Sequence, residues 1–583
     1  MALTVREIKR LIRDKARDEL ISIQDATESY RGVVMDGVLD SALQELFRDA
    51  GDLIHVTEPV TAITAPDPPV WYLGPLEHEG FWPSIKRHLD SNPKYRSAVD
   101  SIDRESTRVM QALPDPSRPE FSGRGMVVGH VQSGKTANFT AVMAKAADAG
   151  YRFIVVLAGM TDALRVQTQH RIERDLIDID EEQMDRWINL TTDGDLQEES
   201  ISTQIIGSHD HCCVAVIKKN HHRVQRLIRI LKNMSDQRKR SCPILIIDDE
   251  CDQASVNSAK VQEERTTTNG LLVDLLRIPP KVAYVGYTAT PYANMLTDID
   301  EGDLYPRSFI ISLKTPPDYF GTEKLFGRHS LDGEHRGNDD GLDMIRSIPQ
   351  EENDRFRLRR NEKDTWRIPV TQSLQQCLRY FLMAAAARRV RGDAVEHCSL
   401  MIHTTFYSRP HEHSRPVIEN EVESLGERIS GEDPDLLESM RVQWEEENNA
   451  VSSNELGLDP VEFADLIPVL PNVARDMQYF VENGASDHRL GGLNDEGEYE
   501  ENFTGGPAIV IGGNVLARGL TIDGLVCSFF VRSSSYYDSL MQMGRWFGYR
   551  RGYEDLPRIW MPADLEQHFK DLATVEHEIR LDI

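Results

Sequence analysis

The sequence predicts an α/β protein with two parallel-sheet lobes, a helical N-terminal domain and an acidic helical insertion in the second lobe. Three observations support this fold class. The chain has 583 residues, which is too long for a single hydrophobic core. Short continuous apolar runs alternate with helical stretches in two separate series, as expected for strands buried on both faces. A glycine-rich loop pattern stands between one such run and a helix.

The composition is that of an ordinary globular protein. Hydrophobic residues make up 40% of the chain and charged residues 28%, and no apolar stretch reaches the about 18 residues that a membrane-spanning helix requires. The N-terminus lacks the apolar core of a signal peptide. The seven cysteines are scattered without a C-x-x-C pair, which favours reduced thiols over disulfides or a zinc site. We therefore expect a cytoplasmic protein without membrane contacts.

The formal net charge of −29 restricts how nucleic acid could be bound. It argues against a basic coat for non-specific DNA binding, whereas a local basic groove on an acidic protein remains compatible with it. Acidic residues gather between about Glu419 and Glu501. A nucleic-acid track is expected to avoid that face.

The first half of the chain divides into two predicted domains. Residues 1–119 predict a helical N-terminal domain, because Ile8, Leu11 and Ile12 recur at helical spacing and a proline-rich piece ends the segment. Residues 120–320 predict the first lobe. Its strand candidates are 153–157, 213–217, 244–247, 282–285 and 309–311.

The second half repeats the alternating pattern. Residues 321–369 are polar and glycine-rich, which is typical of a linker or insertion. Residues 370–583 predict the second lobe, in which an acidic helical insertion occupies about 415–500. The strand candidates of this lobe are 399–402, 508–511 and 525–530.

Residues 129–136 have the pattern G-x-x-x-x-G-K-T of a phosphate-binding loop. Its glycines let backbone N–H groups surround phosphate oxygens. Lys135 is expected to reach the β- and γ-phosphates of ATP, and the Thr136 hydroxyl to hold Mg²⁺. An apolar run precedes the loop and a helix follows it, which is the context that the motif needs. The predicted nucleotide-binding residues are Gly129, Gln132, Ser133, Gly134, Lys135, Thr136 and Ala137.

The apolar run 244–247 ends in the carboxylates of Asp248, Asp249, Glu250 and Asp252. Asp249 is expected to hold Mg²⁺ through water, and Glu250 to orient or deprotonate the attacking water. A solvated acidic turn is the alternative, and the upstream phosphate loop favours the catalytic interpretation. The hydroxyls of Thr288-Ala289-Thr290 follow a later strand, where they could bond the catalytic acids.

The second lobe contains a segment rich in glycine and arginine at 542–551. Arg545 and Arg550 are candidates for an arginine finger, which stabilises charge on the transferring phosphoryl group. An arginine that pairs with surface carboxylates is the ordinary alternative. We prefer Arg545 for the catalytic role.

The order of these motifs resembles a superfamily 2 helicase or translocase, and more narrowly the Z-one domain family of bacterial P-loop ATPases. The matching stretches are 71–75, 129–145, 148–151, 165–171, the acidic box at 249–252 and 542–550. The resemblance implies two RecA-like lobes that bind ATP and Mg²⁺ in the cleft between them. It further implies coupling of hydrolysis to nucleic acid, DNA rather than RNA, beside a partner nuclease in phage defence or restriction.

Two departures from that pattern are visible. Gln542 is one residue closer to Gly544 than in the superfamily, with Met541 in its place, and the second arginine is displaced to Arg550. Proteins that this chain resembles often continue past its C-terminus, so we expect a truncated or naturally short form.

Two other functions stay open at this point. An ATP-gated sensor or clamp would bind nucleic acid and recruit a nuclease without unwinding. A P-loop phosphotransferase or metabolic ATPase would not act on nucleic acid; the arginine-bearing second lobe argues against it, whereas the net charge does not. Arg165, Gln167, Gln169 and Arg171 are candidates for coupling to the phosphate loop, or for an ordinary polar helix face.

Weaker candidates are histidines without a recognisable motif. His209 and His211 precede a buried strand, and no second ligand cluster has zinc spacing. His403, His411 and His413 could contact a phosphate backbone or a nuclease metal, although a loop histidine outside a motif is usually structural.

Overall fold

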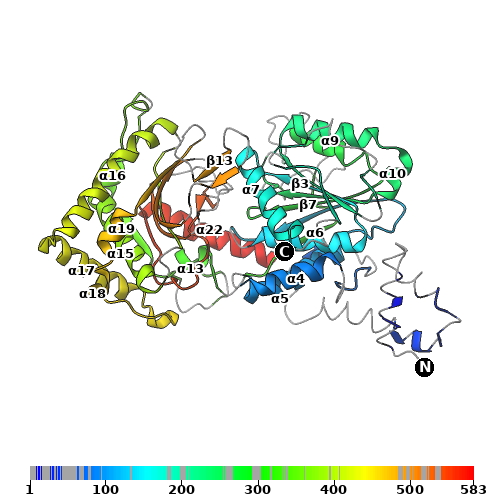
Figure 1. The fold of residues 1–583 in the computed structure, drawn as a ribbon, viewed down its shortest axis with the longest axis horizontal. Coiled ribbons are helices and arrows are strands. Elements are labelled where there is room, and N and C mark those ends of the chain that lie inside the picture. The colour runs from blue at the N-terminus through cyan, green and yellow to red at the C-terminus, as the bar shows by residue number, and fades with distance from the viewer. Residues whose placement is uncertain are drawn as a thin grey trace. The chain divides into compact units, whose positions relative to one another are not determined.

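The structure is a computed structural model of the chain. It describes scattered residues between 5 and 64, then 71–75, 80–92 and 95–582 with gaps, the longest being 197–204, 256–266, 295–303, 514–521 and 532–539. The chain divides into two compact units (Figure 1). The first comprises residues 1–130 and 134–315, and the second comprises 131–133 and 316–582.

The first unit is built on an eight-stranded sheet in the order β1-β8-β2-β7-β6-β3-β5-β4. Strand β1 (Ala62–Thr64) is antiparallel to β8, and the remaining pairings are parallel. The other strands are β2 (Phe121–Val128), β3 (Phe153–Ala158), β4 (Trp187–Asn189), β5 (Cys212–Lys218), β6 (Ile244–Asp249), β7 (Lys281–Thr288) and β8 (Phe309–Ser312). Every strand predicted in this region is present.

Helices cover both faces of this sheet (Figure 1). The core on one face includes α4 (Phe81–Ser91), α5 (Val99–Ala112) and α6 (Lys135–Ala149). The core on the other face includes α9 (His221–Asn233) and α11 (Thr267–Leu275). The remaining helical segments are η1 (Arg96–Ala98), α7 (Asp162–Ile172), the π-helix η2 (Glu173–Ile177) and α10 (Asp236–Ser241).

Helices α4 and α5 belong to the first unit, although the sequence assigns residues 1–119 to an N-terminal domain of their own. Two side chains of α6 hold them. Asp148 accepts hydrogen bonds from the backbone N–H of Phe81 and Trp82 at 2.8 and 2.9 Å, which caps the start of α4. Lys145 is fully buried and pairs with Asp103 of α5 at 2.7 Å. The core that these helices share with the sheet explains the difference.

The second unit contains a six-stranded parallel sheet in the order β10-β18-β16-β11-β15-β12. The strands are β10 (Ile345–Ile348), β11 (His397–His403), β12 (Gln478–Glu482), β15 (Gly506–Gly512), β16 (Leu525–Phe530) and β18 (Arg558–Pro562). The predicted strands are confirmed. The segment expected to be a linker contributes β10, α13 (Thr322–Phe326) and α14 (Gln350–Arg355). Each lobe thus has the predicted parallel-sheet architecture.

The helices of this unit pack against both faces of the six-stranded sheet. One core includes α15 (Gln372–Val390), α16 (Ser408–Ser430), α17 (Pro434–Ala450), α18 (Phe463–Leu466) and α19 (Leu470–Arg475). On the other face Phe569 of α22 (Ala563–Asp582) contacts Phe326, Phe530 and Trp546. The smaller elements are β9 (Tyr319–Phe320), η3 (Asn454–Leu456), β13 (Gly491–Leu493), β14 (Tyr499–Glu501) and β17 (Gly548–Tyr549).

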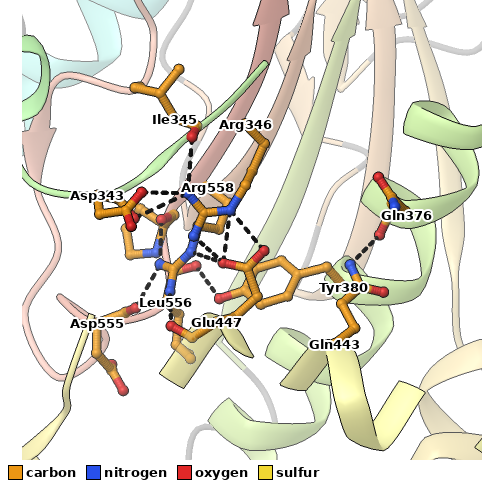
Figure 2. A network of polar contacts seen from close by, with 11 residues as sticks. Asp343, Ile345, Arg346, Gln376, Tyr380, Gln443, Glu447, Asp555, Leu556 and Arg558 are labelled. Atoms are coloured by element: carbon orange, nitrogen blue, oxygen red, sulfur yellow. Dashed lines mark hydrogen bonds and ion pairs between the residues drawn. The ribbon is translucent and has the colours of Figure 1, made fainter. Parts of the chain in front are cut away.

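A buried ionic network fastens the acidic insertion to the second sheet (Figure 2). Glu447 of α17 accepts hydrogen bonds from Arg346 of β10 and from Arg558 of β18, the latter at 2.5 Å. The second nitrogen of Arg558 donates to the Glu447 carbonyl at 2.7 Å. Tyr380 of α15 stacks beside this network and donates to the Leu556 carbonyl at 2.8 Å. The insertion is therefore part of the lobe's core.

Candidate nucleotide-binding site

The phosphate-binding pattern lies where β2 leads into α6. Gly134 has φ +92°, a left-handed conformation, directly before Lys135, the first residue of α6. Glycine adopts this conformation without strain, which accounts for the second glycine of the pattern. The Gly129 N–H donates to the Thr288 carbonyl at 2.9 Å and fastens the start of the loop to the end of β7. Gln132 and Ser133 lie outside the described residues.

Lys135 and Thr136 are half-buried in the first turn of α6, as is Ala137. The Lys135 ammonium donates to the His130 carbonyl at 2.9 Å, so it lies over the loop that precedes it. Nη1 of Arg171, on α7, is 3.5 Å from the Thr136 hydroxyl, the outer limit of a hydrogen bond. These positive groups add to the helix dipole at the same end of α6. This end of the helix suits an anion.

Asp249 ends β6 at the same edge of the sheet, because β2, β7 and β6 are parallel neighbours. Loss of surrounding water raises the pKa of the Asp249 carboxyl above its ordinary value, although Lys135, Lys219 and Arg171 oppose the rise. Arg171 interacts with both Thr136 and Asp249. The hydroxyl and the carboxylate that are predicted to hold Mg²⁺ therefore lie at the same edge of the sheet.

These two oxygen groups fit a hard divalent cation. Mg²⁺ prefers oxygen ligands and is held by one or two protein groups together with substrate phosphates. A bound cation would favour the ionised form of a carboxylate that burial otherwise disfavours. The donor set that Asp249 and Thr136 provide is therefore consistent with the predicted metal.

Glu250 follows Asp249 in an unusual backbone conformation. Its φ of +53° lies in the left-handed region, which few residues other than glycine occupy. The Glu250 carboxylate accepts a hydrogen bond from the Gln253 side chain at 2.7 Å. Strained backbone tends to occur at functional sites, where surrounding groups hold it in place. The predicted water-activating residue thus has a feature that the sequence does not reveal.

Asp252 connects this acidic turn to two threonines, one at the end of β7 and one just after it. The Thr288 hydroxyl donates to one Asp252 oxygen at 2.9 Å, and the Thr290 hydroxyl lies 3.2 Å from the other. The sequence predicts contact between these hydroxyls and the catalytic acids Asp249 and Glu250, whereas the acid that the structure shows bonded to them is Asp252. The turn and β7 are consequently linked side chain to side chain.

Two further charged residues near this turn carry no motif. Asp248 and Lys219 are fully buried and form an ion pair at 2.8 Å. Asp248 also accepts hydrogen bonds from Tyr284 at 2.5 Å and Ser255 at 2.6 Å. The sequence points to Lys219 only through its position. It directly follows a buried strand, at the sheet edge where the motifs lie.

The second lobe contains the two arginine candidates. Arg545 and Arg550 are both buried. The Arg550 guanidinium donates to the carbonyls of Tyr549 at 2.7 Å, Trp546 at 2.9 Å and Phe547 at 3.2 Å, and reaches that of Arg545 at 3.4 Å. It therefore holds the loop in which Arg545 lies. Gln542 lies outside the described residues, and the catalytic role of either arginine stays a prediction.

The histidines and cysteines considered as metal ligands do not form a metal site in the described part of the chain. His403 and His411 are buried, and His411 lies 3.0 Å from the Thr405 carbonyl. Within the described part of the chain, no group of three or more His, Cys, Asp or Glu side chains is arranged to hold a metal. All seven cysteines are buried and free of disulfides. His209 lies outside the described residues.

No helix that the structure describes is long and apolar enough to cross a membrane.

Comparison with protein families supports the resemblance seen in the motifs. Residues 373–583 match the Z1 domain family. The match covers the second lobe and leaves the phosphate loop and acidic box outside it. A search of curated proteins finds no match.

Several solved structures resemble the chain at low sequence identity. Dbp5 of S. cerevisiae bound to RNA and ADP-BeF3 is 13% identical, covering 83% of this chain and 93% of its own, with a TM-score of 0.38. The DUF1998 helicase MrfA bound to DNA is 14% identical, covering 93% and 58%, with a TM-score of 0.39. The Type ISP restriction-modification enzyme LlaBIII bound to DNA is 11% identical, covering 84% and 28%, at 0.36. Each of these TM-scores is below 0.5.

Proposed function

We propose that this chain is an ATPase that couples hydrolysis to binding or movement along nucleic acid, in the manner of a helicase or translocase. The observation that carries the proposal is the arrangement of Lys135, Thr136 and Asp249 around the start of α6. A half-buried carboxylate at the end of β6, with a hydroxyl and an ammonium at a helix N-terminus, forms a set suited to a nucleoside triphosphate and its metal.

Each residue has a distinct role in this reaction. The loop N–H groups and Lys135 bind the β- and γ-phosphates, and Glu250 orients or deprotonates the attacking water. Asp249 and Thr136 would hold Mg²⁺, which neutralises charge on the phosphates when bound. Arg545 of the second lobe stabilises the charge that develops on the transferred group, and Arg550 keeps the Arg545 loop in place.

The polymer and the cellular setting are also proposed. DNA is preferred to RNA, and contacts to the phosphate backbone would carry binding with little sequence preference. A role beside a partner nuclease in bacterial antiviral defence or restriction, in the cytoplasm, is proposed from the resemblance of the motifs described under Sequence analysis. The acidic insertion leaves the track to less negative faces of the protein.

ATP hydrolysis by two variants tests the site. Lys135→Ala is expected to abolish turnover, because the ammonium that neutralises the phosphates is lost. Glu250→Gln is expected to bind ATP but hydrolyse it at least about 100-fold more slowly, because the amide cannot accept a proton from water. Turnover by phosphate release and binding of a fluorescent ATP analogue measure the two effects separately.

The ion pair between exposed Asp236 and half-buried Lys239 on α10 supplies a control. Asp236 is 93% exposed and lies 3.6 Å from Lys239, so Asp236→Ala is expected to leave turnover and binding unchanged. Wild-type hydrolysis by either Lys135→Ala or Glu250→Gln would contradict the assignment of the site.

A further inference from the structure

Lys219 is a buried cation to which the proposed reaction assigns no role. Its side chain is 0% exposed and lies directly after β5. The ammonium pairs with Asp248 at 2.8 Å and donates to the Glu250 carbonyl at 2.7 Å, with the Gln253 carbonyl at 3.5 Å. Lys219 therefore contacts both the end of β6 and the acidic turn that follows it, residues 250–253.

The sheet topology explains how Lys219 reaches this turn. Strand β3 lies between β5 and β6, with Ala158 opposite Lys218 and Leu157 opposite Asp248. The Lys219 N–H donates to the Gly159 carbonyl at 3.0 Å. Its backbone is thus anchored at the end of β3, and the long side chain spans that end to contact the turn after β6.

The turn needs such a contact because Glu250 has a left-handed backbone. A residue other than glycine keeps this conformation only where its surroundings fix it. The Glu250 carbonyl accepts hydrogen bonds from the Lys219 ammonium and from the Gln253 N–H, the latter at 2.9 Å. Of these two donors to the Glu250 carbonyl, Lys219 is the one that lies outside the turn.

The ion pair keeps Lys219 charged in this role. Burial by itself lowers the pKa of the Lys219 ammonium, but the charge and hydrogen bond of Asp248 raise it above its ordinary value. A charged donor makes a stronger hydrogen bond to a carbonyl than a neutral one. Asp248 is in turn fixed by Tyr284 and Ser255.

We propose that Lys219 is a positioning residue for ATP hydrolysis, which holds the turn after β6, residues 250–253, so that Glu250 keeps the conformation that the reaction requires. This inference rests on the proposed function. Lys219 contacts no residue of the phosphate loop in the described part of the chain, so its loss should affect the chemical step more than nucleotide binding.

A second buried lysine of the same unit provides a matched control. Lys145 is also 0% exposed and pairs with a carboxylate, Asp103, at 2.7 Å. It also donates to the Ser106 and Thr107 hydroxyls, each at 2.8 Å, and to the Asp103 carbonyl at 2.6 Å, all on α5. Its ammonium lies 4.4 Å from the centre of the Trp82 ring on α4. Lys145→Met therefore removes a comparable ion pair without touching the acidic turn.

The test compares Lys219→Met with Lys145→Met in the full-length chain. Lys219→Met is expected to lower kcat about 100-fold, the loss typical of misplaced reacting groups, and to change the dissociation constant of a fluorescent ATP analogue less than about threefold. Hydrogen exchange should show loss of protection at the amides of Cys251 and Gln253, which are bonded to Tyr287 and Glu250 in the wild type. Lys145→Met should keep both kcat and that protection.

A double variant guards against simple unfolding. Lys219→Met leaves Asp248 as an unpaired buried charge, which by itself destabilises a protein. Lys219→Met/Asp248→Asn removes both charges, and it should fold and show the same loss of kcat and of protection. Wild-type kcat, or wild-type protection of the turn, in the folded double variant would overturn the inference.

The exchange measurement separates this inference from the proposed function. If the wild type hydrolyses no ATP, the proposed function fails, and with it the role of Lys219 in hydrolysis. Loss of protection in the variants would then still establish that Lys219 holds the turn. Hydrolysis by the wild type with unchanged kcat in the double variant would contradict the inference about Lys219 alone.

Discussion

Arg550 shows how a residue of a catalytic motif can act on its own loop. Its buried guanidinium donates to main-chain carbonyls between Trp546 and Tyr549. A residue with this bonding fixes the path of the chain, which leaves Arg545 as the better candidate for contact with a phosphate. The bonding thus supports the preference for Arg545 that the motif suggested.

Arg550→Ala is expected to destabilise the second lobe. Several buried carbonyls lose their donor, at a cost of about 1–3 kcal/mol for each group left unsatisfied. We expect urea unfolding to detect this loss, and nucleotide binding at the first lobe to stay unchanged. Arg551→Ala is the control, since Arg551 is 40% exposed and pairs with Asp318 at 3.5 Å. An Arg550→Ala protein as stable as this control but without turnover would instead make Arg550 the catalytic arginine.

At the residue scale, the sequence predicts those site residues whose chemistry depends on local spacing. Lys135 and Thr136 follow from the loop pattern, and Asp249 follows from a carboxylate at the end of an apolar strand. Lys219 could not be predicted, because its partners lie on β6 and in the turn that follows it. That Asp252 is the acid bonded to the threonine hydroxyls also depends on tertiary contacts. The left-handed backbone of Glu250 likewise depends on tertiary contacts.

At the scale of elements, continuous apolar runs predicted the buried strands because both faces of each sheet are covered. β10 escaped prediction because Arg346 and Ser347 interrupt its apolar pattern, and it lies at the edge of the second sheet. Helices α4 and α5 were predicted as helical, but their attachment to α6 was not. That attachment depends on Asp148 and Lys145, whose partners are distant in the sequence.

Helix α17 gives a test of stability against pH. Burial by itself raises the pKa of Glu447, but Arg346 and Arg558 bring it below its ordinary value of 4.5. The ion pairs therefore add stability that is fully present above about pH 5 and is lost as the pH falls through the lower pKa of the folded state. Glu447→Gln should cost about 3–5 kcal/mol at pH 7, because two arginines lose their buried carboxylate.

Urea unfolding at pH 7, 5 and below 4 measures this difference. The difference in the free energy of unfolding between the wild type and Glu447→Gln should be constant from pH 7 to 5 and should become smaller below pH 4. Glu438→Gln on the same helix is the control, since its side chain is 61% exposed and its loss should change stability little. A difference in the free energy of unfolding that increases at acidic pH would contradict the ionic origin of the stability.

At the scale of the whole molecule, the residues proposed to act in ATP hydrolysis are distributed over two parallel-sheet lobes. The first contains the acidic turn and the phosphate loop apart from residues 131–133, and the second contains the arginine loop and the Z1 match. The sequence predicts both lobes because the motifs and apolar runs occur in two series. It does not fix the nucleic-acid track, because the net charge of −29 says only that any basic groove is local.

Stimulation of ATP hydrolysis by nucleic acid tests the central claim most directly. The purified chain would be assayed alone and with single-stranded DNA, double-stranded DNA or RNA, with Lys135→Ala beside it. The account predicts hydrolysis that rises with one polymer, most strongly DNA, falls again as salt is added and is absent in the variant. Hydrolysis that no polymer changes would contradict a nucleic-acid-dependent motor.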